Sequence, residues 1–285
     1  MTSEAAASVV ELKQDGDVLL VTINNPPVNA LGAAVRQGLV AAMEQADASA
    51  AVKAVLIVGQ GKAFIAGADI REFGKPPVAP FLPDVCNRIE ACTKPVVAVI
   101  HGAALGGGLE IAMAAHYRLA LPAAKLGLPE VSLGLIPGAG GTQRAPRLMG
   151  VKAATELMLS GSHLSAKAAQ AAGLVDKLEE GSDPVAAGLA YARELLAQGA
   201  PLRRTRTDQS RLADKAAAHA ELDALRAETS KKSRGLFSPL KIIDCVQAAV
   251  DMPFVEGLAF ERAQFLACID SPQRQGLIHA FFAEK

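Results

Sequence analysis

Two uninterrupted apolar segments constrain the fold of this chain more than any other feature. Residues 51–61 read AVKAVLIVGQG and residues 95–102 read PVVAVIHG. A strand with one solvent-exposed face alternates apolar and polar residues, whereas a continuous apolar run is typical of a strand buried on both faces. Segments with helical periodicity, residues 31–49 and 81–93, precede these two runs. The alternation of helices with buried strands predicts an α/β fold.

The remaining segments extend this pattern. Two short strands are expected within residues 9–23, around a turn that contains Gly16. Further helices are expected at residues 106–117, 142–150, 151–161 and 164–173, and further strands at residues 117–122 and 174–179. From about Asp183 onward the pattern is almost wholly helical. We therefore expect an α/β core over residues 1–200 and a helical C-terminal region over residues 201–285.

Charge and composition argue against several classes of protein. The 285 residues include 29 basic and 29 acidic side chains, so the zero net charge gives no reason to expect nucleic acid or an anionic membrane as partner. The most apolar run, residues 96–115, is interrupted by glycines, His101 and Glu110, which argues against a membrane span. Four scattered cysteines without a C-x-x-C pair indicate a reducing compartment, with neither a disulfide framework nor a zinc site. Because we also find no secretory signal, we expect a soluble, cytoplasmic protein without a metal.

The glycine-rich stretch HGAALGGGLE, residues 101–110, marks a candidate site. It lies between a predicted strand and a predicted helix, but neither G-x-G-x-x-G nor Gly-Lys-Ser/Thr occurs, so a nucleotide site loses its main support. No serine lies between Thr93 and Ser132, so the turn carries no hydrolase nucleophile. What remains is a set of backbone N–H groups at a helix start, which favour developing negative charge.

A second loop offers matching N–H groups. FIAGADI, residues 64–70, follows the first buried strand, and the amides of Ala66-Gly67-Ala68 are placed to turn into the same cleft. Two such groups that polarise one carbonyl oxygen form an oxyanion hole. On this pattern alone, a tight-packing turn is an equal alternative.

Two glutamates favour the catalytic interpretation. Glu110 is the only acidic residue between Glu90 and Glu130, and both Glu110 and Glu130 have strongly apolar neighbours. Burial and mutual repulsion push the pKa values of such a pair upward and apart, which suits a division of general acid and base roles. Sequence spacing does not establish that the two carboxyls meet. His101 and His116 have no serine or cysteine beside them, and we interpret both as structural.

These residues lie in segments that resemble the crotonase, or enoyl-CoA hydratase/isomerase, family. The matching segments are NNPPVNAL, KAFIAGADIREF, KPVVAVIHGAALGGGLEIAMAAHYRLA, LGLPEVSLGLIPGAGGTQRAPRLMG and LSAKAAQAAGLVD, in consistent order within residues 8–178. The resemblance implies a crotonase-like spiral of repeated β-β-α units, with an acyl-CoA bound in a bent form across the core.

The resemblance also implies a role for each matching residue. The N–H groups of Ala68 and Gly107 would hold the thioester carbonyl, and Gly106 would give the thioester room. Glu130 would exchange the proton at the α-carbon, and Glu110 would act chiefly on water. No separate cofactor is expected, because coenzyme A is part of the substrate. Contacts with coenzyme A are implied for Lys62 and Arg71 at its phosphates and for Ala66, Asp69 and Ile70 at its adenine or pantetheine.

The presence of both glutamates favours hydration of 2-trans-enoyl-CoA to 3-hydroxyacyl-CoA in fatty-acid β-oxidation. The same pair suits the shift of a 3-enoyl double bond to position 2. Another crotonase reaction, such as thioester hydrolysis, is a weaker alternative because family members with other chemistry lack or replace one of the glutamates. An acyl-CoA-binding homologue without activity is weaker still, because it needs neither of them.

The C-terminal segment carries a second resemblance. Residues 238–285 are similar to the segment that joins the hydratase domain to the dehydrogenase domains in multifunctional β-oxidation proteins. No dinucleotide fingerprint follows this segment in this sequence. The sequence is compatible with a hydratase unit excised from a longer protein and with a free-standing one. Single-activity members are usually trimers or pairs of trimers, whereas the multifunctional kind closes its acyl pocket with its own final helix. We expect residues 273–282 to fold back on their own core, with a homotrimer as the alternative and Phe281-Phe282 used for helix packing.

Overall fold

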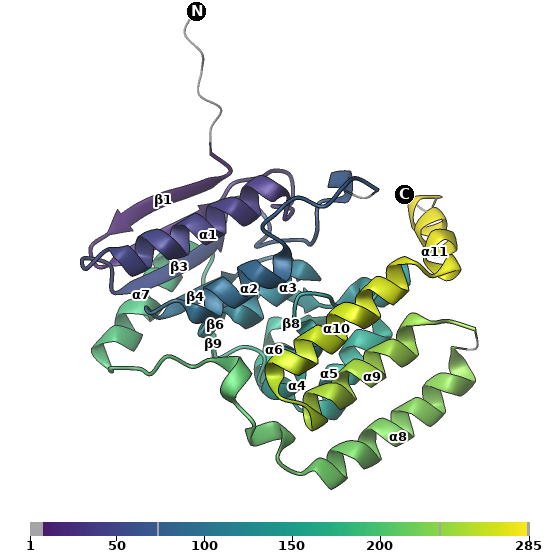
Figure 1. Ribbon diagram of the computed structural model, residues 1–285. Coiled ribbons are helices and arrows are strands. Elements are labelled where there is room, and N and C mark those ends of the chain that lie inside the picture. Colours follow the sequence, from purple (N-terminus) through teal and green to yellow (C-terminus); the bar gives the residue numbers. More distant parts are fainter. Residues whose placement is uncertain (1–7, 73, 234, 284–285) are drawn as a thin grey trace, which may run out of the picture.

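A six-stranded sheet forms the centre of the computed structural model, which describes residues 8–283 apart from Phe73 and Arg234 (Figure 1). Its strands, in spatial order, are β1 (Val10–Asp15), β2 (Val18–Ile23), β3 (Ala54–Gly59), β4 (Val96–Ile100), β6 (Tyr117–Ala120) and β9 (Lys177–Leu178). β1 and β2 are antiparallel, and all later neighbours are parallel. Every residue of β3 and β4 is buried, which confirms the two apolar segments as central strands.

Helices cover both faces of this sheet. On one face, α7 (Pro184–Ala197) packs on β3 and β4, and its Tyr191 and Leu195 join the apolar cluster of those strands. The larger core lies on the other face, where α1 (Ala33–Ala48), α2 (Leu82–Ala91) and α3 (Gly107–Ala114) contribute buried side chains. The predicted α/β fold is confirmed.

A second sheet of three short strands does not follow from the sequence pattern. It contains β5 (Ala103–Leu105), β7 (Lys125–Gly127) and β8 (His163–Ser165). Three residues are too few to show the alternation that predicts a strand. β8 takes the first two residues of the segment predicted as a helix, which begins only at α6 (Ala166–Ala171). A bridge between Ile65 and Ala104 joins the loop after β3 to this small sheet.

Helices dominate the second half of the chain. α4 (Gly141–Met149) and α5 (Val151–Ser160) are covered by α8 (Lys215–Lys232), α9 (Ser238–Asp251) and α10 (Phe254–Ile269), which form the layer at the lower right of Figure 1. The main core cluster contains residues from both predicted regions, among them Met158, Leu222 and Val246. The boundary proposed at residue 200 stays a prediction.

The almost continuous helix expected from Asp183 is interrupted over residues 198–214. α7 ends just before Gly199, which has a φ of 61°. Beyond it lie only the 3-10 turns η3 (Thr205–Thr207) and η4 (Ser210–Leu212). Contacts with the core outweigh helix propensity here, since the backbone N–H and Nε of Arg206 both donate to the carboxylate of Glu90.

The last helix lies against the core. α11 (Pro272–Ala283) packs on η2 (Pro129–Leu133), and a Cβ on Gly134 would lie 3.0 Å from Leu277 Cδ1. This packing agrees with the expected fold-back of residues 273–282, whereas the oligomeric state stays a prediction. The side chains of Phe281 and Phe282 lie outside the described part of the structure.

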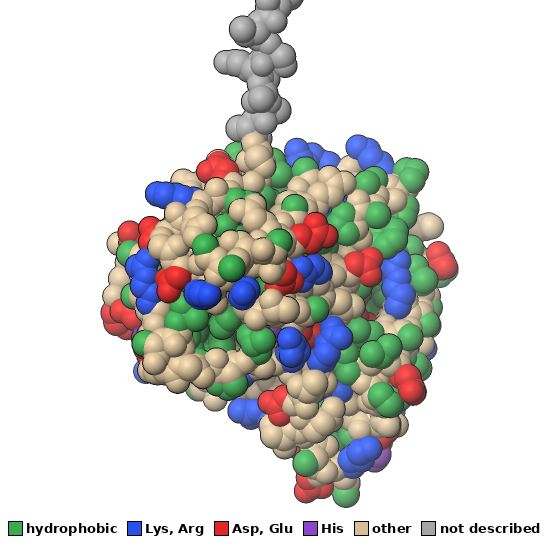
Figure 2. Space-filling model, turned by 60° about the vertical axis from the view of Figure 1, so that its left-hand side comes forward, with side chains coloured by type: hydrophobic (Ala, Val, Ile, Leu, Met, Phe, Trp, Pro, Cys, Tyr) green, Lys and Arg blue, Asp and Glu red, His purple; other side chains and the backbone are tan. Residues whose placement is uncertain are grey.

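The surface carries charges of both signs. Figure 2 shows basic and acidic side chains interspersed with apolar ones across the visible face. Exposed ion pairs, such as Lys152–Glu156 and Lys232–Glu228, are part of this mixed surface. Across the described residues, no helix combines the length and the apolar character needed to cross a membrane.

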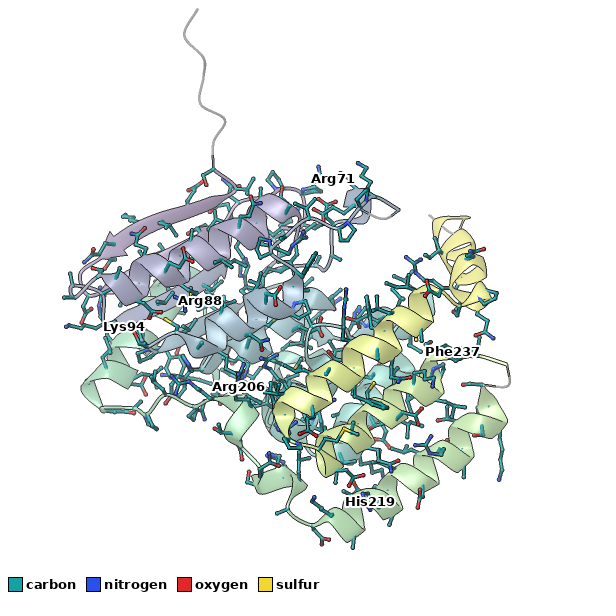
Figure 3. The ribbon with its side chains drawn as sticks, in the orientation of Figure 1. Arg71, Arg88, Lys94, Arg206, His219 and Phe237 are labelled. Carbon is teal, nitrogen blue, oxygen red and sulfur yellow. The ribbon has the colours of Figure 1, made fainter. Side chains whose placement is uncertain are left out.

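A buried ion cluster ties the helices to the core. The side chains of Glu90 and Arg144 are each 1% exposed, and their Oε2 and Nη2 atoms lie 2.7 Å apart. Arg206, labelled beside the first turn of α10 in Figure 3, reaches the same Oε2 through Nε at 2.7 Å. The guanidinium carbons of Arg144 and Arg206 each lie 5.1 Å from the ring centre of Phe254. Burial alone would raise the pKa of Glu90, but the two guanidinium groups outweigh it and hold the pKa below its usual range.

We expect Arg144→Met to lower the free energy of unfolding by roughly 3–5 kcal/mol, because it leaves the buried Glu90 carboxylate without its main partner. Lys152→Met is the matched control, since it removes the exposed partner of Glu156 and should cost no more than about 1 kcal/mol. Denaturant unfolding of both variants measures the difference. Equally small losses would contradict a structural role for the cluster.

Candidate active site

The turn between β5 and α3 requires glycine at position 106 and leaves little room for a side chain at position 107. Gly106 has φ 54° and ψ −125°, a conformation that is strained for any residue with a side chain. Its N–H donates to the carbonyl of Gly127 at 2.9 Å, which joins the turn to β7. Gly107 then begins α3, and a Cβ on it would lie 2.6 Å from Leu82 Cδ2. A larger residue at position 107 would therefore push the side chain of Leu82 aside.

The loop after β3 brings the second predicted amide to this turn. Gly67 has a φ of 125°, and a Cβ on it would lie 3.5 Å from the carbonyl oxygen of Leu105, which immediately precedes the Gly106 turn. Neither the N–H of Ala68 nor that of Gly107 donates a hydrogen bond within the part of the chain that the structure describes. Two unused amides on adjoining turns match what an oxyanion hole needs.

The carboxylate of Glu110, which lies on α3, is bound by backbone amides at the start of α4. The residue is 3% exposed, and its Oε1 accepts the N–H groups of Ala139 at 2.7 Å and Gly141 at 2.8 Å. Its Oε2 accepts no hydrogen bond from the described residues. Burial raises the pKa of Glu110, and the two N–H bonds offset only part of this effect. The carboxylate is thus oriented through one oxygen while the other remains free.

Glu130 lies on η2, beside the Gly106 turn. A Cβ on Gly106 would lie 3.1 Å from Glu130 Oε1. Although the residue as a whole is partly exposed, its Oε2 is buried and has no hydrogen-bond partner among the described residues. Burial, followed by the negative charge of Glu110, raises the pKa of Glu130 well above its usual range. The protonated form of this carboxyl is therefore favoured over a wider pH range than that of an exposed glutamate.

The structure brings the predicted catalytic groups to one turn. Glu130 Oε1 lies near Gly106, and the N–H of Glu110 donates to the carbonyl of Gly106. The segments with Gly107 and Ala68 adjoin this turn. Both pKa values are raised, as expected from burial and repulsion, and the two carboxyls also differ in hydrogen bonding. The catalytic role of each residue stays a prediction.

A third buried carboxyl, Glu261 of α10, belongs to the same region and was missed by the sequence analysis. It is 1% exposed and accepts the N–H groups of Gly140 at 2.7 Å and Thr142 at 3.0 Å. Burial, then the charge of Glu110, raises the pKa of Glu261 to about 8 against these hydrogen bonds. Only the packing of α10 on α4 brings this residue to the site, so no local sequence signal marks it.

Two of the residues expected to contact coenzyme A pair with each other. The side chain of Asp69 is 8% exposed, and its Oδ2 lies 2.7 Å from Nη2 of Arg71, whose side chain is 70% exposed. The Arg71 hydrogen bonds hold the pKa of Asp69 below its usual range although burial opposes them. Figure 3 shows Arg71 at the outer edge of the molecule, on η1 (Ile70–Glu72).

The other three expected coenzyme A contacts lie on the same loop. Lys62 is exposed, and the N–H of Ala66 donates to the carbonyl of Val28 at 3.0 Å. The side chain of Ile70 lies outside the described part of the structure. Contact of any of them with coenzyme A stays a prediction.

The two histidines lie apart from the carboxyls. His116 is fully buried, and its Nδ1 accepts the N–H of Val96 at 2.9 Å. Nε2 of His101 lies 3.2 Å from the carbonyl of Gly61. Burial lowers the pKa of both imidazoles, which favours the neutral form. These contacts support the structural interpretation of His101 and His116.

Comparison with known proteins places the chain in a family. The family model described as enoyl-CoA hydratase/isomerase matches residues 13–240. The peroxisomal bifunctional enzyme of Danio rerio is 43% identical over 268 residues, which are 94% of this chain and 37% of that protein. The peroxisomal fatty acid beta-oxidation multifunctional protein of Oryza sativa subsp. japonica is 38% identical over 284 residues, which are 97% of this chain and 39% of that protein. The chain thus spans less than two fifths of the length of these relatives.

Solved structures agree with this placement. A carnitinyl-CoA dehydratase from Mycobacterium avium 104 has a TM-score of 0.72 and 28% identity, over 98% of this chain and 97% of that one. The chain belongs to the enoyl-CoA hydratase/isomerase family.

The raised pKa of Glu130 predicts a pH-dependent cost to stability. The folded state binds the proton on Glu130 more tightly than the unfolded state does, which contributes to the free energy of unfolding at low pH. This contribution is lost as the pH rises through the folded-state pKa. Glu130→Gln cannot ionise, so we expect its stability relative to the unmodified protein to increase as the pH rises above the usual glutamate range and through the folded-state pKa of Glu130. Urea unfolding at several pH values measures the difference. Exposed Glu221→Gln is the control, and a stability difference for Glu130→Gln that stays constant with pH would contradict the burial of an ionisable group.

Proposed function

We propose that this protein adds water to the double bond of a 2-trans-enoyl-CoA, giving a 3-hydroxyacyl-CoA, as a step of fatty-acid β-oxidation. The observation that carries the proposal is the pair of buried, interacting carboxyls, Glu110 and Glu130, close to the Gly106 turn. Membership of the enoyl-CoA hydratase/isomerase family supports it, as does similarity to the fatty acid beta-oxidation multifunctional protein of Oryza sativa.

The amides of Ala68 and Gly107 bind the thioester carbonyl oxygen in this proposal. Negative charge grows on that oxygen as water attacks, because the substrate passes through an enolate-like state. Donors fixed in advance stabilise such charge without reorganising during the reaction. The first turn of α3 adds its unpaired N–H groups, which favour an anion at the same place.

The two carboxyls divide the proton transfers. Glu110, whose ionised form accepts two N–H bonds, takes a proton from water while the water oxygen bonds to C3. The electron pair of the double bond moves toward C2 and the thioester oxygen, and protonated Glu130 then delivers its proton to C2. The proton on Glu110 returns to Glu130 through solvent before the next turnover.

Isomerisation of a 3-enoyl-CoA is the second candidate function. It is favoured by Glu130 Oε2, which is buried, free of hydrogen bonds and part of a carboxyl with a strongly raised pKa. Such a group is suited to remove a proton from C2 and return it at C4, and this transfer uses no water. Glu110 is then dispensable for the chemistry.

Further proposals concern the contacts with coenzyme A, the oligomeric state and the location in the cell. Lys62 and Arg71 would meet the phosphates of coenzyme A, with no cofactor beyond the substrate itself, and a self-covered monomer or a homotrimer would carry the site. The two curated relatives are named as peroxisomal. For this chain we keep the cytoplasm as the proposed location, because all four cysteines are free and buried, and cell fractionation distinguishes the two compartments.

We expect Glu130→Gln to lower kcat for hydration of crotonyl-CoA by roughly 10²–10⁴-fold, because it removes the general acid. Binding of the thioester should change little, since the amide donors remain. Glu110→Gln should lose hydration to a similar extent but retain most of any isomerisation of a 3-enoyl-CoA. Loss of enoyl absorbance and appearance of 2-enoyl product report the two reactions.

Exposed Glu221→Gln serves as the control and should match the unmodified protein in both assays. Full hydration activity in Glu130→Gln would overturn the proposed mechanism. Release of free thiol without a 3-hydroxyacyl product would instead favour thioester hydrolysis.

A further inference from the structure

Four consecutive amides, those of residues 139–142, are shared between two buried carboxyls. The sharing alternates: the N–H groups of Ala139 and Gly141 donate to Glu110, and those of Gly140 and Thr142 donate to Glu261. Because successive amides of this turn go to different carboxyls, Glu110 and Glu261 hold the same segment from two sides. A shift of the segment on one side therefore changes the hydrogen bonds on the other.

Glu261 reaches this segment from a distant part of the chain. It lies on α10, 121 residues after Gly140 and 119 after Thr142, and is 1% exposed. The hydroxyl of Thr142 donates to it as well, so three donors converge on one carboxyl. An apolar residue at position 261 would leave these buried donors unpaired, which is costly.

We propose that Glu261 is a positioning residue for the hydration reaction. It fixes residues 139–142 so that the amides of Ala139 and Gly141 hold Oε1 of Glu110 and leave Oε2 free for water. The inference rests on the proposed function, since it concerns the same site. α10, which follows the segment matched by the family model, thereby completes the placement of a catalytic carboxyl.

Titratable groups on every helix packed around Glu261 belong to the same electrostatic environment. They are Glu110 of α3, Glu130 of η2, Arg144 of α4, Cys86 of α2 and Cys245 of α9, with Asp84 and Arg262 at an adjoining cavity. Among them, Glu110 makes the largest contribution to the raised pKa of Glu261 after burial itself. The repulsion is mutual, so a negative Glu261 also makes ionisation of Glu110 harder.

Glu261→Gln tests the proposal in the full chain, with exposed Glu256→Gln on the same helix as control. We expect kcat for crotonyl-CoA hydration to fall roughly ten- to a hundredfold, because the Glu110 oxygen is no longer held in place. KM should stay within about twofold, since the thioester and coenzyme A contacts are untouched. Because the pKa of Glu261 is about 8, the variant loses a like charge only above about that pH, so only the alkaline, carboxyl-dependent limb of the pH–rate profile should move to lower pH.

A second variant separates geometry from charge. Glu261→Asp keeps the charge but shortens its reach, so kcat should fall without the shift of the pH–rate profile. A residue that only stabilised the fold would lower the melting temperature in both variants and leave the pH–rate profile unchanged. A kcat and a pH–rate profile in Glu261→Gln equal to those of the unmodified protein overturn the proposal.

Thr142→Val covers the case in which Glu261→Gln does not fold. It removes only one donor to Glu261, and we expect a several-fold lower kcat at unchanged KM; an unchanged kcat overturns the proposal. Failure of the proposed function is distinguished by the unmodified chain, which would then hydrate no enoyl-CoA. In that case both proposals are wrong. If the unmodified chain is active and the variants at positions 261 and 142 match it, only the proposed role of Glu261 is wrong.

Discussion

The hydrogen bonds between the amides at the start of α4 and the Glu110 carboxylate are the interaction on which the site depends. A carboxyl that is 3% exposed is costly to ionise, and the N–H groups of Ala139 and Gly141 offset part of that cost. They also leave one oxygen free for chemistry. Glu130 lacks such donors on its buried oxygen, so its carboxyl keeps a proton more readily. The different hydrogen bonding of two like residues thus underlies the proposed division into an acid and a base.

The scaffold around these carboxyls explains the glycine-rich turn. The small sheet anchors both the Gly106 turn, through Gly127, and the loop after β3, through the bridge from Ile65 to Ala104. Two amides from segments far apart in the sequence are therefore presented together. The Glu90–Arg144 cluster contacts the same region, since Arg144 also donates to the carbonyl of Ala139 just before α4. The buried Glu90–Arg144 pair positions the neighbouring groups more than it raises the free energy of unfolding.

Local patterns predicted those parts of the structure that local physics determines. The apolar runs of β3 and β4 marked the central strands, and the apolar neighbours of Glu110 and Glu130 marked a costly pair of carboxyls. The pairing of Ala68 with Gly107 came from the family resemblance, because no spacing rule joins residues on different loops. The strands β5, β7 and β8 were missed, since their three-residue length carries no period.

Glu261 shows the limit of such reasoning most clearly. Its sequence neighbours, AFERAQF, predict an ordinary helix with an acidic residue on one face. Only the packing of α10 on α4 converts that residue into a buried partner of the amides of Gly140 and Thr142. Its importance therefore depends on contacts more than a hundred residues apart in the chain, which no local pattern contains.

The central claim is that Glu110 and Glu130 together add water to a polarised enoyl thioester, with the hydroxyl group and the proton delivered to the same face of the double bond. Proton NMR of the product formed from crotonyl-CoA in D₂O tests it most directly. The account predicts a 3-hydroxyacyl thioester with a single deuterium at C2, on the same face as the new hydroxyl group. Deuterium distributed over both faces of C2, or a thioester cleaved without a hydroxyl at C3, would contradict it.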